Sequence, residues 1–328
     1  MRDVRVCGLL FALGLMTCVY SGAANAAANE DAYPAKPIRF IVPFAPGGTN
    51  DVLARMIANH LSEKFDKPVI VDNRPGADGV IGTQIVSKSA PDGYTMMIVS
   101  AAYAMNPAVR SLPFDPKNAV DFVMKVGDGP TLLTVGPALK VNSVKELFAV
   151  TKAKPGQIVF GTSGGFQHFA TALFRGLSAQ DINIVVYKGA GPALIDVLGG
   201  QTHATIVPIV PSLPHIRSGK LTPLAAGTLK RSSMFPQMPT LDELGVKGYH
   251  SSNWYAIAVP PGTPKPVITK LYDDIGAYMR QPATVKTFTS MGGELDLRTA
   301  DEVREMIPTE IAKWTKVAIE AGMARDVR

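Results

Sequence analysis

The sequence predicts an α/β fold, and two observations lead to that prediction. Short apolar runs rich in β-branched residues indicate buried strands, and they alternate with longer stretches whose apolar residues recur at helical spacing. This alternation is typical of a mainly parallel sheet with helices on both faces. The predicted strands cover residues 38–42, 69–71, 95–99, 132–135, 158–160, 184–186, 205–207, 224–226 and 256–259. The predicted helices cover residues 50–65, 80–87, 143–152, 168–177, 192–198, 241–244, 266–278 and 300–321.

The first strand and the helix after it form the most informative pair. Residues 38–42 are apolar and mostly β-branched, and the Pro-Gly-Gly of residues 46–48 ends the strand. Residues 49–51 offer three N-cap candidates, and Leu53 opens an apolar repeat that continues to Phe65. A glycine loop that opens a helix at the carboxyl edge of a sheet presents N–H groups and a positive helix end to small anions. The pair therefore predicts an anion site.

Later helices carry ordinary start signals that concern the fold and not a ligand. Ser143 and Glu146 have the spacing of a capping box. Pro264 and Pro266 lie at the start of the helix that follows them, where a missing N–H costs little.

The N-terminal residues predict a signal peptide over residues 1–26. Arg2 and Arg5 precede an apolar stretch over residues 6–20, and Ala24-Asn25-Ala26 forms an A-x-A cleavage site, so cleavage is expected near Ala26. The two cysteines, Cys7 and Cys18, both lie in this segment, so the mature chain has no disulfide or thiolate metal site. A lipobox that ends at Cys18 stays open as an alternative, although Thr17 replaces its usual small residue.

Composition excludes several classes of function. The net charge is +6, but the basic residues are scattered and no basic stripe alternates with aromatic residues, so nucleic acid is not an expected partner. The five histidines are widely spaced without metal-binding motifs, so neither a metal nor a cofactor is expected. The roughly 300 residues that follow cleavage are most easily divided into two domains.

Six segments together resemble one family. They are PIRFIVPFAPGGTNDVLAR at residues 37–55, VDNRPGADGVIG at 71–82, PDGYT at 91–95, YKGAGPALIDVLGGQ at 187–201, FPQMPTLDELG at 235–245 and WYAIAVPPGTP at 254–264. In content and order they resemble the Bug family, the periplasmic substrate-binding proteins of tripartite tricarboxylate transport systems. The resemblance implies a Venus-flytrap fold with two α/β lobes around a cleft and a mainly parallel sheet in each lobe.

The resemblance also implies where the lobes begin and end. Lobe one takes residues 27–128 and 250–328, and lobe two takes residues 129–249. The chain then crosses between lobes near residues 126–130 and 248–253, both rich in Gly or Ser. Closure of the lobes about these crossings would bury a small solute.

The resemblance also implies that four loops contact the ligand, largely through backbone groups. The predicted site residues are Phe44, Ala45, Pro46, Gly47, Gly48, Thr49 and Asn50 in the first loop; Ala101, Ala102 and Tyr103 after the strand at 95–99; Thr162, Ser163, Gly164, Phe166 and His168 in the second lobe; and Tyr187 and Gly189 after the strand at 184–186. Asp51 is expected to cap the helix or support the loop, because its carboxylate repels an anion.

The loop at residues 161–165 allows two interpretations. GTSGG satisfies G-x-S-x-G, the nucleophile elbow of α/β-hydrolases, and Asp196 followed by His203, His215 or His250 would complete a triad order. The same strand–loop–helix also makes an anion cradle, and its position matches the family's second ligand-binding loop, so binding is favoured. The loop is about two residues shorter than the family's usual form. Phe166 then either forms an aromatic wall for a flat ligand or packs at the start of the helix.

The sequence therefore predicts a periplasmic solute-binding protein and not an enzyme. The expected ligand is a small organic carboxylate, either a dicarboxylate or an aromatic carboxylate, with Tyr103 and Phe166 favouring the aromatic class. The expected partners are the membrane components of a tripartite tricarboxylate transporter or a sensor kinase, and the protein is expected to be a monomer. The alternative function is an exported serine esterase that uses Ser163.

Overall fold

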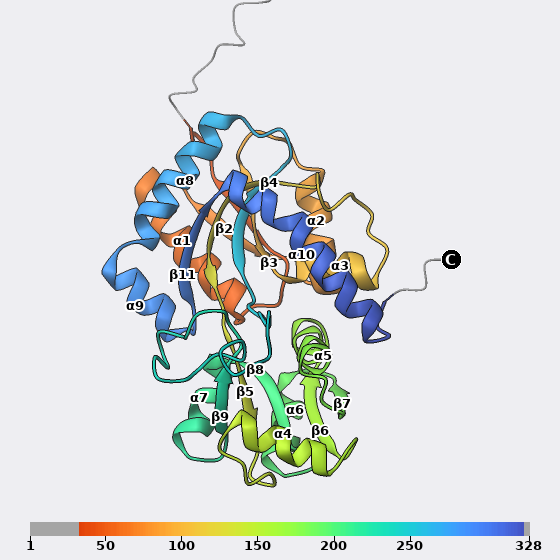
Figure 1. Cartoon of the computed structure of the whole chain (residues 1–328). Helices are drawn as coiled ribbons and strands as arrows, with labels where there is room; N and C mark the ends of the chain where they lie inside the picture. Colours follow the sequence, from red (N-terminus) through yellow and green to blue (C-terminus); the bar gives the residue numbers. More distant parts are fainter. Residues whose placement is uncertain (1–32, 325–328) are drawn as a thin grey trace, which may run out of the picture. The chain divides into compact units, whose positions relative to one another are not determined.

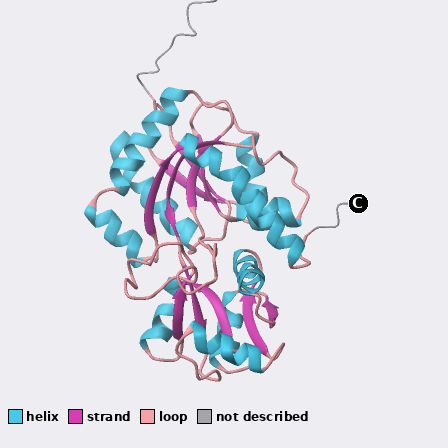
Figure 2. Cartoon of the chain, in the orientation of Figure 1, coloured by secondary structure: helices cyan, strands magenta, loops and turns pink. Residues whose placement is uncertain are grey.

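The computed structural model describes residues 33–324, and the compact unit discussed here begins at Lys36. This unit has an α/β fold with two lobes, each built on its own sheet (Figures 1 and 2). The predicted signal peptide, its cleavage near Ala26 and the lipidation alternative at Cys18 lie outside the described residues. Among residues 33–324, no helix is long and apolar enough to cross a membrane.

The first lobe holds a six-stranded sheet in the order β11-β4-β10-β3-β1-β2. Its strands are β1 (Ile38–Val42), β2 (Val69–Asn73), β3 (Thr95–Ser100), β4 (Asp121–Asp128), β10 (Tyr255–Val259) and β11 (Glu294–Thr299). Its helices are α1 (Thr49–Phe65), α2 (Val80–Ser87), α3 (Ala102–Val109), α8 (Lys265–Met279), α9 (Pro282–Ser290) and α10 (Ala300–Glu320), with a 3₁₀ turn at Ala77–Gly79.

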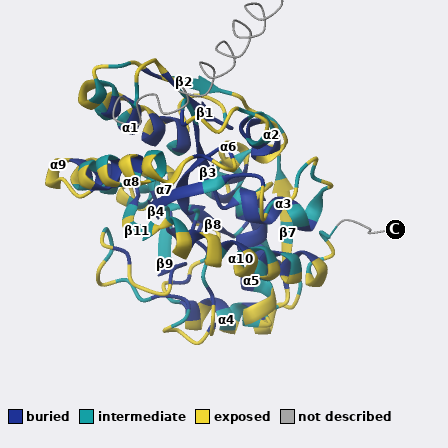
Figure 3. Ribbon diagram, turned by 90° about the horizontal axis from the view of Figure 1, so that it is seen from above, coloured by how far each residue is buried: buried dark blue, intermediate teal, exposed yellow. Residues whose placement is uncertain are grey.

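The second lobe holds a five-stranded sheet in the order β7-β6-β8-β5-β9. Its strands are β5 (Thr131–Val135), β6 (Ile158–Ser163), β7 (Ile182–Tyr187), β8 (Ala204–Pro208) and β9 (Thr222–Ala226). Its helices are α4 (Val144–Ala153), α5 (Phe166–Ser178), α6 (Ala190–Leu198) and α7 (Ile209–Arg217). The central strands β5 and β10 are buried along their whole length, whereas the edge strands β2, β7 and β11 are partly exposed, as Figure 3 shows from above.

Both sheets are mixed, which corrects the expectation of a mainly parallel sheet in each lobe. In the first lobe β1 pairs in parallel with β2 and β3, but β10 runs antiparallel to β3 and β4, and β11 runs antiparallel to β4. In the second lobe β6 pairs in parallel with β7 and β8, but β5 runs antiparallel to β8 and β9. The antiparallel pairs arise because the chain enters or leaves each lobe through β4, β5 and β10, without a helical crossover.

All nine predicted strands are present, but five elements were not predicted. These are β4, β11, α3, α7 and α9. Lys125 interrupts the apolar run of β4, and Pro107 lies inside α3, so each element carries a residue that lowers its strand or helix signal. The helix predicted at residues 241–244 is wrong, because these residues form turns.

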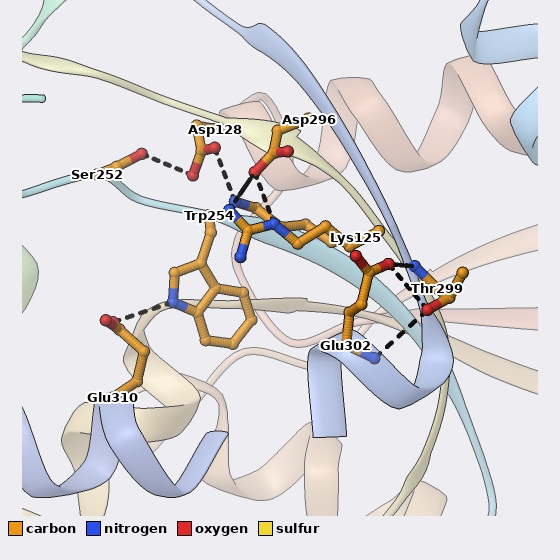
Figure 4. Close-up of polar contacts among 9 residues, drawn as sticks. Lys125, Asp128, Ser252, Trp254, Asp296, Thr299, Glu302 and Glu310 are labelled. Atoms are coloured by element: carbon orange, nitrogen blue, oxygen red, sulfur yellow. Dashed lines mark hydrogen bonds and ion pairs between the residues drawn. The ribbon is translucent and has the colours of Figure 1, made fainter. Parts of the chain in front are cut away.

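The two crossings between the lobes lie side by side. Gly129 and Asn253 exchange backbone hydrogen bonds of 3.0 and 3.1 Å, and the Ser252 hydroxyl donates to the Asp128 carboxylate at 2.9 Å. Lys125 is buried and donates to Asp128 at 2.7 Å and to Asp296 of β11 at 2.6 Å (Figure 4). These bonds join both crossings to the first sheet.

The C-terminal helix α10 spans the two lobes. It packs on α3 and β4 of the first lobe and on α5 of the second. Trp314 of α10 is fully buried and makes edge-on ring contacts with Phe166 and Phe169 of α5, with centroids 6.4 and 5.7 Å apart. Trp254 is also buried, and its indole N–H points to Glu310 of α10 (Figure 4). Both tryptophans therefore have structural contacts.

Candidate ligand-binding cleft

Helix α1 begins without a side-chain cap. Its N-cap residue is Gly48, with φ −79° and ψ 168°, and the first helical hydrogen bond runs from the Val52 N–H to the Gly48 carbonyl, 3.0 Å. Thr49, Asn50 and Asp51, which were predicted as caps, instead form the first turn of the helix. The N–H groups at this helix end therefore receive no capping oxygen from a described side chain, and they remain available to an anion.

Asp51 fixes the shape of the first loop. Its buried carboxylate accepts the Gly47 N–H at 3.0 Å, two Arg55 N–H groups at 3.0 Å and the Asn73 amide at 2.8 Å. Asn73 also donates to the Phe44 carbonyl at 3.1 Å. The hydrogen bonds from Arg55 lower the pKa of Asp51 to about 2. Asp51 therefore supports the loop, as the sequence predicted.

Strand β3 of the first lobe leads directly into α3. Because β1 and β3 are parallel neighbours, their carboxyl ends lie at one edge of the sheet. The Ala101 N–H donates to the Asn253 side chain at 3.3 Å, and Asn253 donates to the Tyr255 hydroxyl at 3.3 Å. Burial raises the pKa of Tyr255 to about 12. The crossing segment at Asn253 thus contacts the start of α3.

The second lobe supplies a glycine loop between β6 and α5. Gly165 is the N-cap residue of α5 and has φ +64°, a conformation that glycine adopts without strain. Helix α5 also lacks a side-chain cap among the described residues. The buried Gln167 side chain accepts the Ser163 N–H at 3.3 Å and pairs with the Ser163 hydroxyl. The bonds that hold this loop are therefore all to neutral acceptors, in contrast to the charged Asp51 of the first loop.

These loops enclose a cleft of about 520 Å³. Six of the predicted site residues line it: Phe44, Asn50, Ala102, Gly164, Phe166 and His168. The other lining residues are Asp78, Ser100, Met105, Asn106, Val109, Arg110, Gly165, Phe169, Asn253, Gly322 and Met323. Both lobes and the C-terminal segment after α10 contribute, so the lining joins apolar side chains to a few polar groups, as small-molecule sites commonly do.

Two polar side chains of the cleft lining, Asn50 and His168, carry no charge at neutral pH. Asn50 is 9% exposed, and its Oδ1 is buried without a hydrogen-bond partner among the described residues. Burial lowers the pKa of His168, so its imidazole is neutral at neutral pH. Within the described part of the chain, no cluster of His, Cys, Asp or Glu has the makings of a metal site.

Of the other predicted residues, Thr49 begins α1 and Ala101 is the fully buried N-cap residue of α3. Ala45, Pro46, Gly47 and Gly48 are exposed in the first loop, beside Phe44 and Asn50. Thr162 and Ser163 belong to the second loop, but Thr162 is fully buried and its hydroxyl donates to the Ser163 carbonyl at 3.1 Å.

The structure places three other predicted residues away from the cleft lining. Tyr103 is buried, donates to the Pro116 carbonyl at 2.6 Å and packs edge-on against Phe122, so it belongs to the core. The Tyr187 hydroxyl donates to Asp196 at 2.6 Å. Neither Tyr187 nor Gly189 lines the cleft. Tyr103 therefore gives no reason to expect an aromatic ligand.

The serine esterase alternative lacks its catalytic partners. Among the described residues, the Ser163 hydroxyl hydrogen bonds to Gln167 and to the Gly164 carbonyl and not to a histidine. Asp196 accepts from Tyr187, and His203 Nδ1 accepts the Val159 N–H at 3.0 Å. The G-x-S-x-G pattern is therefore part of a loop that opens a helix and not part of a triad.

Sequence reasoning missed the cleft residues that α3 supplies. Asn106 and Arg110 reach the cleft because α3 extends to Val109, and Pro107 had hidden that helix. Asn253 was expected only as part of a crossing. Gly322 and Met323 follow α10, and nothing local in the sequence connects them to the first loop.

A two-lobed α/β fold with a cleft between the lobes is typical of solute-binding proteins, and sequence comparison gives the family. The family model described as "Tripartite tricarboxylate transporter family receptor" (TctC) matches residues 53–323. Protein BugT of Bordetella pertussis is 39% identical over 319 residues, which cover 96% of this chain and 97% of that protein. The chain belongs to the TctC (Bug) family of periplasmic solute-binding proteins, which is not an enzyme family.

Solved structures agree with this assignment. Rpa4515 of R. palustris, solved with adipate, has a TM-score of 0.77 and 34% identity, and the match covers 89% of this chain and 99% of that one. MatC of Rhodopseudomonas palustris, solved with bound malate, has a TM-score of 0.71 and 25% identity, covering 87% and 99%. The periplasmic binding protein BugD has a TM-score of 0.73 and 28% identity, covering 89% and 99%.

Proposed function

We propose that this protein captures a small organic carboxylate in the cleft and delivers it to a tripartite tricarboxylate-type transporter. The observation that carries the proposal is the pair of uncapped helix starts, α1 and α5, that reach one cleft from opposite lobes. Backbone N–H groups at a helix start suit carboxylate oxygens, because both the hydrogen bonds and the helix dipole favour an anion.

Helix starts elsewhere in the molecule are of both kinds, capped and uncapped. Ser143 caps α4 by accepting the Glu146 N–H at 3.2 Å, and Thr299 forms a complete capping box with Glu302 at the start of α10 (Figure 4). Neither α4 nor α10 contributes its first turn to the cleft lining. Helices α6, α7, α8 and α9 also begin without a side-chain cap, so α1 and α5 are distinguished by residues of their first turns that line the cleft.

The ligand class is inferred from chemistry and from relatives. Structures similar to this one were solved with adipate and with malate, both dicarboxylates. The predicted site residues in the loops at residues 44–50 and 162–168 would contact the ligand through N–H groups, and Phe166 would cover its apolar body. Tyr187 and Gly189 would contribute only if the second lobe moves.

Closure of the lobes would complete the site. We place the lobe boundaries at residues 128–129 and 249–250, with lobe one at residues 27–128 and 250–328. The paired crossings at Gly129 and Asn253 would then act as the hinge, since they are where both chain segments pass between the sheets. Export with cleavage near Ala26 would put the mature chain in the periplasm.

A binding screen tests the proposal. Mature protein from Ala27 is titrated calorimetrically with aliphatic mono- and dicarboxylates, tricarboxylates, amino acids and aromatic carboxylates, alongside thermal unfolding. One carboxylate class should bind and raise the melting temperature, because a ligand that binds only the folded state stabilises it. Absence of binding across the panel would contradict the proposal. Loss of uptake of the bound ligand in cells that lack the gene would test delivery.

A further inference from the structure

Arg110 is a charged residue at the cleft whose guanidinium is incompletely bonded. It follows α3 directly and lines the cleft with Asn50 and Gly164. One terminal N–H group pairs with Asp78 at 2.5 Å, while Nε is shut off from solvent without a partner among residues 33–324. A buried donor with no acceptor is destabilising, so Arg110 is held in an arrangement that a better acceptor would improve.

Asp78 holds its carboxylate at the same end of the cleft. The backbone at Asp78 has φ +52°, in the left-handed region, and its carbonyl accepts the Asn106 amide at 3.1 Å. A methyl group added to Gly165, the N-cap of α5 in the second lobe, would lie 3.7 Å from Asp78 Oδ1. A protein carboxylate therefore lies between the Arg110 cation and an open helix start, which is a place where a ligand carboxylate would be stabilised.

The pair of Asp78 and Arg110 determines how the cleft can accept a second negative charge on the ligand. Asp78 and Arg110 are its only Asp, Glu, Lys or Arg residues within the described chain, and their charges cancel. A ligand with one carboxylate needs only the helix starts. A ligand with two carboxylates brings a second charge into the same cleft, and Arg110 is the lining cation that can accept it.

We propose that Arg110 sets the specificity of the cleft for dicarboxylates by binding the second carboxylate, and that Asp78 is its competing counterion in the empty cleft. This inference rests on the proposed function and names the substrate class of that same site. On binding, the guanidinium turns from Asp78 toward the ligand, so that it donates two parallel N–H groups to one carboxylate.

The test compares a dicarboxylate with its own monoamide, which has the same length and shape but one charge fewer. Adipate and adipamate are titrated calorimetrically into wild-type protein at neutral pH. If another dicarboxylate binds most tightly in the screen, that dicarboxylate and its monoamide replace them. Wild type should prefer the dicarboxylate at least about tenfold, because a hydrogen bond between two charged groups is stronger than one to a neutral amide.

Four variants assign this preference to residues. Arg110→Gln should bring the ratio of the two affinities close to one while the monoamide affinity stays within about threefold, and Arg110→Lys should retain part of the preference. Arg231→Gln is the matched control, because it removes an exposed arginine paired with Glu243 in the second lobe and should leave the ratio unchanged. Asp78→Asn removes the competing charge and should raise the dicarboxylate affinity about threefold.

The outcomes separate this inference from the proposed function. Failure of the wild type to bind any carboxylate overturns both. Equal binding of dicarboxylate and monoamide, an equal loss of both in Arg110→Gln, or a monocarboxylate as the tightest ligand overturns only the role of Arg110. Preference for an amino acid that Asp78→Asn abolishes also overturns it, because Asp78 would then bind an ammonium group.

Discussion

The two glycine loops of the cleft have the same plan but different supports. Each follows a parallel strand and opens a helix that has no side-chain cap, β1 to α1 in the first lobe and β6 to α5 in the second. Asp51 ties the first loop to Arg55 and Asn73 through charge-assisted hydrogen bonds. In the second loop, Gln167 braces only Ser163.

This difference suggests that the two lobes contribute differently to ligand binding. The first loop is already ordered before a ligand binds, so less conformational entropy is lost on binding. The second loop has fewer internal bonds, and its helix contacts α10 through Phe166 and Phe169 on Trp314. We therefore expect the first loop to contribute most of the affinity and the second to adjust to the ligand as the lobes close.

The largest effect is expected from Gly48→Asp. An aspartate is a favoured N-cap, so its carboxylate would accept the first-turn N–H groups of α1 and repel an anionic ligand. A β-carbon at Gly48 meets only the Ala45 carbonyl, at 3.9 Å, so the fold should persist. We expect the carboxylate affinity to fall about 100-fold, since 1.4 kcal/mol corresponds to a factor of ten.

Gly48→Ala is the matched control for that variant, because it adds the β-carbon without the carboxylate. It should bind within a few-fold of wild type in the same calorimetric titration. Wild-type affinity in Gly48→Asp would contradict a role for the α1 start in binding.

Asp51→Ala tests the bracing of the first loop. It leaves the Gly47 N–H, Arg55 and Asn73 without their shared acceptor, so the free energy of unfolding should fall by about 2 kcal/mol. Affinity should fall about tenfold because the loop must then be ordered on binding. Chemical denaturation and calorimetry measure the two effects, and an unchanged affinity would show that the loop needs no brace.

Gln167→Ala makes the corresponding change in the second loop. It removes a neutral acceptor from Ser163, and neutral hydrogen bonds contribute about 0.5–1.5 kcal/mol, so we expect only about a threefold loss of affinity. A loss equal to or larger than that of Asp51→Ala would reverse the proposed division between the loops.

The smallest expected effect is on the stability of the folded protein as the pH falls, where His168 and Asp51 act in different pH ranges. Burial lowers the pKa of His168, so the unfolded chain binds its proton first and stability falls as the pH drops below about 6.5, the ordinary histidine pKa. The pKa of Asp51 is also lowered, to about 2, so the stability that Asp51 contributes is complete above about 4 and is lost only below that.

Denaturation of wild type and His168→Gln between pH 7.5 and 5 isolates the histidine. The two unfolding free energies should approach or cross as the pH falls, because only wild type loses the histidine contribution. Parallel curves would show that His168 titrates equally in the folded and unfolded chain.

The sequence predicted the parts of this site that depend on local order. Residues 38–51 contain a strand, a glycine break and a helix start within one segment, so the first loop could be recognised without the fold. The two lobes and the cleft came from family resemblance, since the first lobe is built from two segments that are far apart in the chain.

Two site residues were assigned wrongly from the sequence, Tyr103 by inclusion and Arg110 by omission, and both depend on long-range contacts. Tyr103 lies between two alanines and looked available to a ligand, but its burial against Phe122 is fixed only when α3 packs on the sheet. Arg110 has no motif around it, and its place at the cleft follows from α3, whose proline concealed it. Mixed sheets escaped prediction because strand direction depends on where the chain crosses between lobes.

Amide NMR of the mature protein during titration with its tightest carboxylate tests the central claim most directly. The N–H signals of the α1 start at Thr49–Asn50 and of the α5 start at Phe166–His168 should shift together, with one half-saturation concentration that matches calorimetry. Calorimetric binding with both sets of signals unmoved would contradict the claim that the two helix starts hold the ligand.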